Sequence, residues 1–178
     1  IAAPAVAQTP PVNFEGKQPV MLIGFAPGGG TDLAGRLVAQ FIGKHLPGSP
    51  TFVVRNLPGA DGLTAGNIFH NQTPADGLTI TMGASTQADP LHYRKPQANF
   101  DPTKFGLVGG VGRGGTVMIV NRAEEKRLTD KSLRPLNMGS LSGLPRSGMQ
   151  MTAWGIHFLG WNAKWVLGYP GTNDLMTA

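Results

Sequence analysis

Residues 25–32 read Phe-Ala-Pro-Gly-Gly-Gly-Thr-Asp, and they join an apolar run to a helical pattern. The run, residues 19–25, has the length and character of a buried strand. Residues 31–45 repeat apolar side chains at helical spacing, and Pro47-Gly48 ends the pattern. A strand, a glycine-rich turn and a helix begin a βαβ unit. The buried face of the helix is predicted to consist of Leu33, Leu37, Phe41 and the pair Val38 and Ile42.

The alternation of strand and helix continues along the first half of the chain. Residues 51–55 predict a second strand, residues 62–71 a second helix and residues 78–82 a third strand. Short turns rich in glycine and proline separate them. This order predicts an α/β fold with a parallel sheet and crossover helices.

The middle of the chain changes character. Residues 105–111 and 116–120 are apolar runs that predict two strands, with a tight bend at the glycine-rich residues 112–115. Beyond residue 121 the sequence is polar and basic, which predicts the crossing into a second domain. Asn121 and Glu124 predict a capping pair there.

The second half restarts the pattern. A strand is predicted at residues 136–139, a helix at 147–159, a strand at 163–167 and a helix from Asp174 onward. The predicted organisation is therefore a tail at residues 1–14, a first α/β domain at 15–121 and a second at 122–178.

Composition excludes several classes of protein. The 178 residues contain no cysteine, which excludes a disulfide framework and a cysteine nucleophile. No apolar run reaches the ~18 residues that a membrane-spanning helix requires. The net charge of +5 is concentrated at residues 101–150, but no aromatic residues interleave the basic ones between 113 and 146, so we predict no nucleic-acid partner.

The residues also predict no catalytic, metal or cofactor site. The four histidines lack metal-ligand spacing and are predicted to be surface or satisfied side chains. Residues 110–115 match G-x-G-x-x-G, but a strand pattern follows where a dinucleotide site needs a helix. The serines around Gly143 are not ordered as a nucleophile elbow. Trp154, Trp161 and Trp165 are predicted to pack in the core rather than to form a stacking platform.

Two segments have two interpretations each. The turn at residues 28–31 can present backbone N–H groups to a carboxylate or phosphate, or it can be a structural turn capped by Thr31 or Asp32. Residues 1–8 resemble the end of a secretory signal peptide, with Ala5-Val6-Ala7 before the cut, or they form a flexible tail.

Four motifs carry a resemblance to a known family. They are Phe25-x-Pro27-Gly28-Gly29-x-x-Asp32, Arg55-Asn56-x-Pro58-Gly59-Ala60-x-Gly62, Pro74-x-Asp76-Gly77 and Tyr169-x-Gly171. In this order, over residues 19–178, the chain resembles the Bug-type periplasmic receptors of tripartite tricarboxylate transporters. An extra residue separates Pro74 from Asp76, and the chain is roughly 120 residues shorter than a typical member.

The resemblance implies a periplasmic binding protein-like fold of type II. Two lobes with parallel or mixed sheets would enclose a ligand cleft, and the second lobe would be incomplete, so we expect exposed apolar faces and an unpaired sheet edge. It implies an exported receptor that captures a di- or tricarboxylate, without a cofactor, and delivers it to a membrane transporter. The alternatives are a sensing or interaction module of the same fold and, less favoured, an enzyme acting on a carboxylate or phosphate.

By family position, the ligand would contact four turns through backbone N–H groups, hydroxyls and water. In the first lobe the predicted contacts are Phe25, Ala26, Pro27, Gly28, Gly29, Gly30, Thr31, Gly83, Ala84 and Ser85. In the second lobe they are Ser140, Leu141, Ser142, Gly143, Tyr169, Pro170 and Gly171.

Overall fold

The computed structural model describes residues 12–83, 85–112, 117–140, 148–169 and 172–177. Helices and strands alternate through both halves of the described chain, as the sequence pattern predicted. The elements, with η for 3₁₀ helices, are β1 (Val20–Ile23), α1 (Gly30–His45), β2 (Val53–Asn56), η1 (Ala60–Gly62), α2 (Leu63–Gln72), β3 (Thr79–Met82), η2 (Ser85–Ala88), α3 (Pro90–Tyr93), η3 (Pro102–Lys104), η4 (Arg122–Glu124), α4 (Glu125–Thr129), β4 (Leu136–Ser140), α5 (Gly148–Phe158), β5 (Ala163–Leu167) and α6 (Thr172–Thr177).

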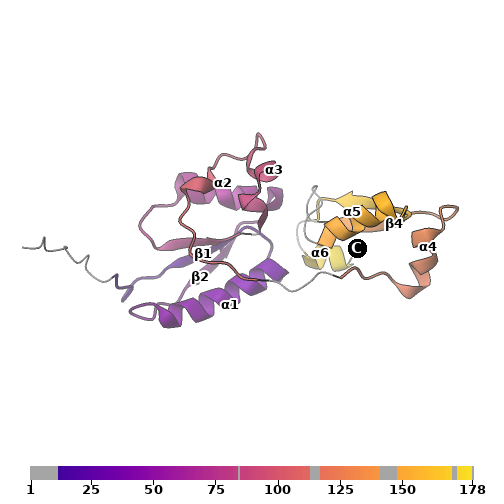
Figure 1. Ribbon diagram of the computed structural model, residues 1–178. Coiled ribbons are helices and arrows are strands. Elements are labelled where there is room, and N and C mark those ends of the chain that lie inside the picture. Colours follow the sequence, from indigo (N-terminus) through magenta and orange to yellow (C-terminus); the bar gives the residue numbers. More distant parts are fainter. Residues whose placement is uncertain (1–11, 84, 113–116, 141–147, 170–171, 178) are drawn as a thin grey trace, which may run out of the picture.

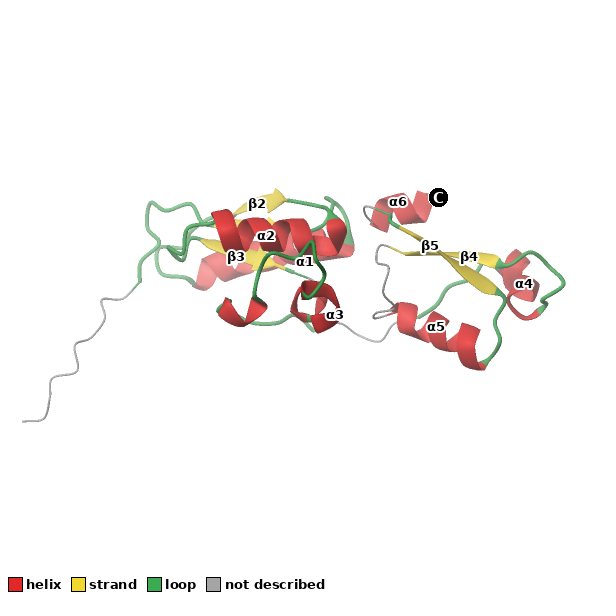
Figure 2. Cartoon of the chain, turned by 90° about the horizontal axis from the view of Figure 1, so that it is seen from above, coloured by secondary structure: helices red, strands yellow, loops and turns green. Residues whose placement is uncertain are grey.

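Two parallel sheets organise the chain. The first has the strand order β2-β1-β3, with Val20 of β1 paired to Val53 on one side and to Thr79 on the other. The second pairs β4 with β5 in parallel, and its register aligns Leu136 with Ala163. Figures 1 and 2 show the sheets in separate halves of the molecule, with α1 and α2 on opposite faces of the first sheet. The prediction of an α/β fold with parallel sheets is confirmed.

Helix α1 packs on the first sheet through small residues. Its buried residues are Asp32, Gly35, Ala39 and Gly43. A Cβ atom at Gly35 would lie 2.6 Å from Cδ1 of Ile23, so glycine lets the helix approach the sheet closely. The core on this face contains Met21, Ile23 and Ala39, with Val38, Phe52, Val54, Ile80 and Met82 packed against it.

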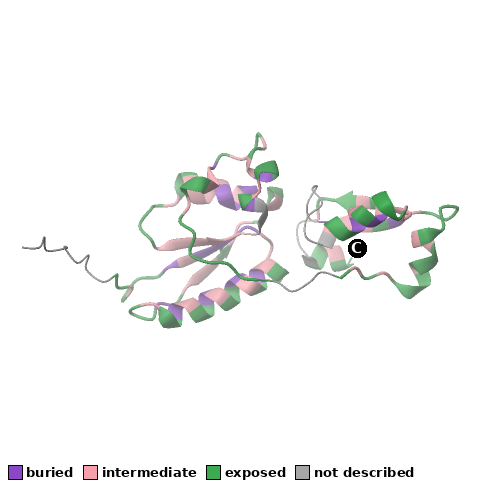
Figure 3. Ribbon diagram, in the orientation of Figure 1, coloured by how far each residue is buried: buried purple, intermediate pink, exposed green. Residues whose placement is uncertain are grey.

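The predicted buried face of α1 is therefore largely wrong. Leu33, Leu37 and Phe41 are 60%, 57% and 50% exposed, whereas Val38 and Ile42 are half-buried. Apolar spacing selected the largest side chains, but a helix that lies close to a sheet must turn its smallest residues inward. Figure 3 shows the exposed positions along the outer side of α1.

The apolar segments between the two sheets form no strand among the described residues. Residues 105–112 and 117–120 are irregular, and Leu107 and Ile119 are 91% and 86% exposed. The strand prediction was wrong here, because a strand needs a hydrogen-bonded neighbour and none of the described residues supplies one. Residues 113–116 of the predicted bend lie outside the described residues.

Helix α4 and the preceding turn show half of the predicted capping pair. The N–H of Ala123 donates to Oδ1 of Asn121 over 3.0 Å, as expected for a cap. The Glu124 carboxylate instead pairs with Arg127.

In the second half, Gly155 of α5 lies against the ring of Trp161. Trp161 and Trp165 are half-buried, but Trp154 is 69% exposed, so the core assignment was wrong for that residue. Its ring contacts Phe158 on the outer side of α5, at a centroid distance of 5.7 Å, and Phe158 is itself 70% exposed. Exposed apolar faces, expected from the sequence, are thus present on α1 and α5.

Close packing of α1 predicts a position-dependent effect of a single methyl group. A Cβ atom at Gly43 would meet the backbone oxygen of Pro50, whereas one at Gly30 would have no neighbour within 4 Å. Gly43→Ala should lower the free energy of unfolding by about 1–3 kcal/mol through overpacking. Gly30→Ala, the matched control, should leave it unchanged or raise it by up to about 1 kcal/mol. Urea denaturation of the full chain checks this, and equal effects at the two positions would contradict the packing described.

Candidate functional site

The carboxylate of Asp32 organises the turn between β1 and α1. Its Oδ2 accepts hydrogen bonds from the N–H of Gly28 at 2.8 Å and from Nε of Arg36 at 2.9 Å. Its Oδ1 accepts one from Nδ2 of Asn56 at 2.8 Å. Asp32 is 1% exposed, so three donors surround a buried negative charge.

Asn56 extends this set of contacts to two strand ends. Its Nδ2 also donates to the carbonyl oxygen of Phe25 at 2.9 Å, and its Oδ1 accepts from Nη2 of Arg36 at 3.0 Å. Because Asn56 ends β2 and Phe25 follows β1, the side chains connect both strand ends to the first turn of α1. We call Asp32, Arg36 and Asn56 the turn clamp.

The turn clamp bears on the two interpretations of the glycine turn. The N–H of Gly28 is already bound to Asp32, so this group is not open to an anionic ligand. Asp32 thus holds the turn before the helix, but the N-cap residue of the helix, Gly29, makes no side-chain cap hydrogen bond. Anion binding by the N–H groups of residues 29–31 stays a prediction. Burial alone would raise the pKa of Asp32, but hydrogen bonds from Arg36, Asn56 and the Gly28 N–H, together with the charge of Arg36, lower it to about 2.

A second turn follows β2 and has an unusual backbone. Gly59, Ala60, Asp61 and Gly62 have φ values of 139°, 48°, 58° and 89°. Non-glycine residues rarely adopt positive φ, so Ala60 and Asp61 mark this turn as strained.

A buried glutamine connects the second turn to the third. Nε2 of Gln87, which is 8% exposed, donates to the carbonyl oxygen of Gly62 at 2.9 Å. Gly83, at the end of β3, packs directly on the Gln87 side chain, and Gly24 lies close to Gly62. The turns after β1, β2 and β3 therefore meet around one amide side chain.

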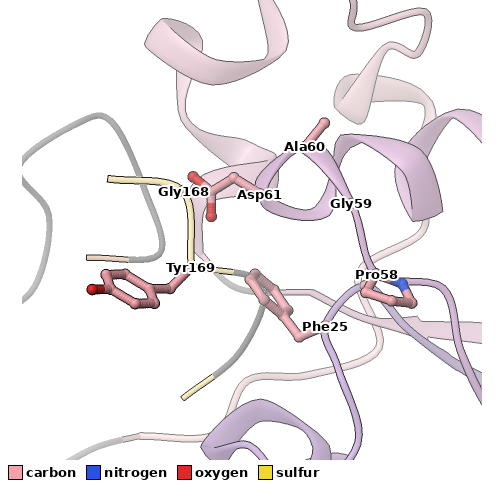
Figure 4. A pocket seen from close by; sticks show the side chains of 8 residues that line it. Phe25, Pro58, Gly59, Ala60, Asp61, Gly168 and Tyr169 are labelled. Carbon is pink, nitrogen blue, oxygen red and sulfur yellow. The ribbon is translucent and has the colours of Figure 1, made fainter. Parts of the chain in front are cut away.

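These turns form one side of a pocket of about 410 Å³. Gly24 and Phe25 come from the end of β1, Pro58 to Asp61 from the turn after β2, and Gly168 and Tyr169 from the end of β5. Figure 4 shows the rings of Phe25 and Tyr169 and the carboxylate of Asp61 around it. The pocket thus lies at the carboxyl ends of strands from both sheets, where open α/β sheets bind ligands.

Two of the predicted site residues, Phe25 and Tyr169, line this pocket. Gly83 lies against Gln87, and Ser85 begins η2. Ser140 is buried at the end of β4, where its carbonyl oxygen accepts the N–H groups of Gly168 and Tyr169 and its hydroxyl donates to Sδ of Met149. The predicted residues Ala26, Pro27, Gly28, Gly29, Gly30 and Thr31 are described but are not among the pocket lining. The predicted residues Ala84, Leu141, Ser142, Gly143, Pro170 and Gly171 lie outside the described residues.

Sequence reasoning did not assign the lining residues Gly24, Pro58, Gly59, Ala60, Asp61 and Gly168 to the site. A signal was present for four of them. Residues 58–61 form a proline- and glycine-rich turn directly after a predicted strand, which is the same arrangement as at residues 25–32. Gly24 and Gly168 follow strands singly, and isolated glycines carry no such signal.

Charged groups are sparse among the lining residues that the structure describes: Asp61 is acidic, and none of the others is charged. His92 is fully buried behind Asp61, and its Nε2–H donates to the carbonyl oxygen of Asp61 at 3.0 Å. Across the described residues, no group of three or more histidine or acidic side chains is placed to hold a metal ion. No helix in the described part of the chain is long and apolar enough to cross a membrane.

Comparison with known proteins supports the fold. The chain is similar to the structure of R. palustris Rpa4515 with adipate, with a TM-score of 0.65 and 23% sequence identity. The match covers 90% of this chain and 55% of that chain, so this chain spans about half the length of Rpa4515. No protein-family model matches the chain, and no curated protein matches it. Membership of the Bug-type receptors therefore stays a prediction.

The turn clamp predicts a pH-dependent contribution to stability. The pKa of Asp32 lies near 2 in the folded chain and near 3.8 when unperturbed, so its ionised form stabilises the fold at neutral pH by about 2 kcal/mol. Because the folded pKa is the lower one, this contribution is complete above pH 5 and is lost as the pH falls from about 4 to 2. Asp32→Asn should lower the unfolding free energy at pH 7, and its difference from wild type should shrink by roughly half at pH 3. Urea denaturation at both pH values checks this. A difference that stays constant with pH would show that Asp32 does not act through its charge.

Proposed function

We propose that this protein binds a small organic carboxylate in the pocket between the strand ends of its two sheets. The observation that carries the proposal is the origin of the lining: β1, β2 and β5 all contribute the residues that follow their carboxyl ends. The similarity in fold to a protein solved with adipate supports the ligand class.

The lining suits a flexible acid with a short carbon chain. Glycines at three places in the lining, Gly24, Gly59 and Gly168, leave backbone uncovered by side chains. The N–H of Gly168 is already bonded to Ser140, so the backbone donors proposed for a carboxylate are those near Gly24 and Gly59. Phe25 and Tyr169 provide aromatic surfaces for methylene groups, and the Tyr169 hydroxyl adds a polar group. A pocket with aromatic walls and a few polar groups is typical of small-molecule sites.

More specifically, we propose that the protein is a receptor of a tripartite tricarboxylate transporter. In it, the two sheets belong to two lobes of a type II periplasmic binding protein, the pocket is the ligand cleft, and the loaded receptor delivers its carboxylate to membrane subunits in the periplasm. The order of the four motifs supports this proposal, as does the turn clamp, in which two of the motifs contact each other through Asp32 and Asn56.

Binding in this pocket predicts different effects for two phenylalanines. Phe25→Ala removes an aromatic wall and should weaken binding of adipate or a related dicarboxylate by about tenfold or more. Phe41→Ala is the matched control, because Phe41 is half exposed on α1 and is not among the pocket lining; it should change the affinity less than about twofold. Isothermal titration calorimetry with C4 to C6 dicarboxylates and a tricarboxylate checks this.

Two results would contradict the proposed site. If the parent chain binds no carboxylate at millimolar concentration, the ligand class is wrong. If it binds one and Phe25→Ala binds it as tightly as the parent does, the ligand occupies another place.

Delivery is tested separately with the cognate membrane subunits in sealed vesicles. Labelled carboxylate should accumulate when the loaded receptor is added and should not when free carboxylate is added at the same concentration. Equal uptake in both cases would exclude the receptor role and favour a sensing module.

A further inference from the structure

Asp61 is an acidic residue in the pocket lining, which is unexpected for a receptor that binds unsubstituted dicarboxylates. It lines the pocket, and among the described lining residues no lysine or arginine offsets its charge. A second carboxylate brought into the same space would be repelled. The residue therefore needs an explanation beyond the proposed binding of a carboxylate.

The backbone holds the Asp61 side chain in this position at a cost. Its φ of 58° and ψ of 39° are left-handed, and the preceding Ala60 has a φ of 48°. Neighbouring contacts maintain the conformation: Gly62 is bound to Gln87, and the carbonyl oxygen of Asp61 accepts the Nε2–H of His92. Strain that is held by its surroundings is common at binding sites.

The carboxylate itself is almost enclosed. The side chain is 12% exposed, and its Oδ2 is buried with no hydrogen-bond partner among the described residues. Nδ1 of His92 is 3.8 Å from Oδ2, which is longer than a hydrogen bond. Oδ1 is then the oxygen through which the side chain can reach the pocket. A carboxylate in such a place is stabilised by a donor that enters with the ligand.

We propose that Asp61 accepts a hydrogen bond from an ammonium or hydroxyl group of the ligand. This inference rests on the proposed function and deepens it: the bound molecule is an amino- or hydroxy-substituted carboxylate. Its acid group contacts the exposed backbone of the glycine turns, and its donor group contacts Asp61. Unsubstituted dicarboxylates bind more weakly, because they offer Asp61 no donor and so do not offset its charge.

A matched ligand series tests the proposal on the full chain. Glutarate, 2-hydroxyglutarate and glutamate share five carbons and two carboxylates, and they differ in the donor at one carbon. Calorimetry should show that at least one of the two substituted acids binds about tenfold or more tightly than glutarate. Tighter binding of glutamate identifies an ammonium partner, and tighter binding of 2-hydroxyglutarate identifies a hydroxyl partner.

Two variants at Asp61 fit the left-handed backbone. Asp61→Gly removes the carboxylate and relieves the strain. It should bind glutarate more tightly than the parent does, and its affinities for glutarate and the two substituted acids should agree within about twofold. Asp61→Asn keeps an acceptor oxygen without charge, so it should retain part of a preference for hydroxyl and lose a preference for ammonium. Asp101→Asn, at an exposed cap away from the pocket lining, is the matched control and should keep the parent's preference.

The outcomes separate this inference from the proposed function. The inference is overturned if glutarate binds the parent as tightly as both substituted acids do, or if Asp61→Gly still prefers a substituted acid. In either case Asp61 does not accept a hydrogen bond from the ligand, while carboxylate binding stands. If neither the parent nor Asp61→Gly binds any acid of the series, the proposed function and this inference both fail.

Discussion

The buried carboxylate of Asp32 is the constraint on which the pocket depends. Its bonds to Gly28, Arg36 and Asn56 hold the end of β1, the end of β2 and the first turn of α1 in one arrangement. The strands β1 and β2 pair through four residues each, and the N–H of Leu57 donates to the carbonyl oxygen of Ile23 at their ends. With the turn held in this way, Phe25 and the backbone beside it form a stable wall.

Small residues let the remaining parts come close enough to form the other walls. Gly35 and Gly43 allow α1 to lie on the sheet, while Gly24, Gly62 and Gly83 let three turns meet around Gln87. Glycines also make up three of the described lining residues, Gly24, Gly59 and Gly168, so the selectivity of the pocket depends on a few side chains. Of these, Asp61 carries the charge, and Phe25 and Tyr169 carry the apolar surface.

The order of elements was predictable from the sequence, because strand and helix periods are local and glycine or proline turns separate them. The strand at Ala163–Leu167 and the strand at Leu136–Ser140 fall at their predicted places. The buried face of α1 was not predictable. Gly35 lets the helix approach the first sheet more closely than Leu37 would, and apolar spacing does not include this effect of side-chain size. The site was predictable only in part. Phe25 and Tyr169 follow from family position, whereas Asp61 reaches the pocket through a left-handed backbone that residue pattern alone does not reveal.

If a carboxylate occupies the space between the strand ends of the two sheets, amide NMR of the full chain during titration with a dicarboxylate will locate it there. The largest shifts should fall on the amides of Gly24, Phe25, Ala60, Asp61 and Gly168, which follow strands of both sheets, and these shifts should saturate together with one affinity. Shifts confined to residues beside one sheet, or centred away from these strand ends, would show that the carboxylate does not bind between the two sheets.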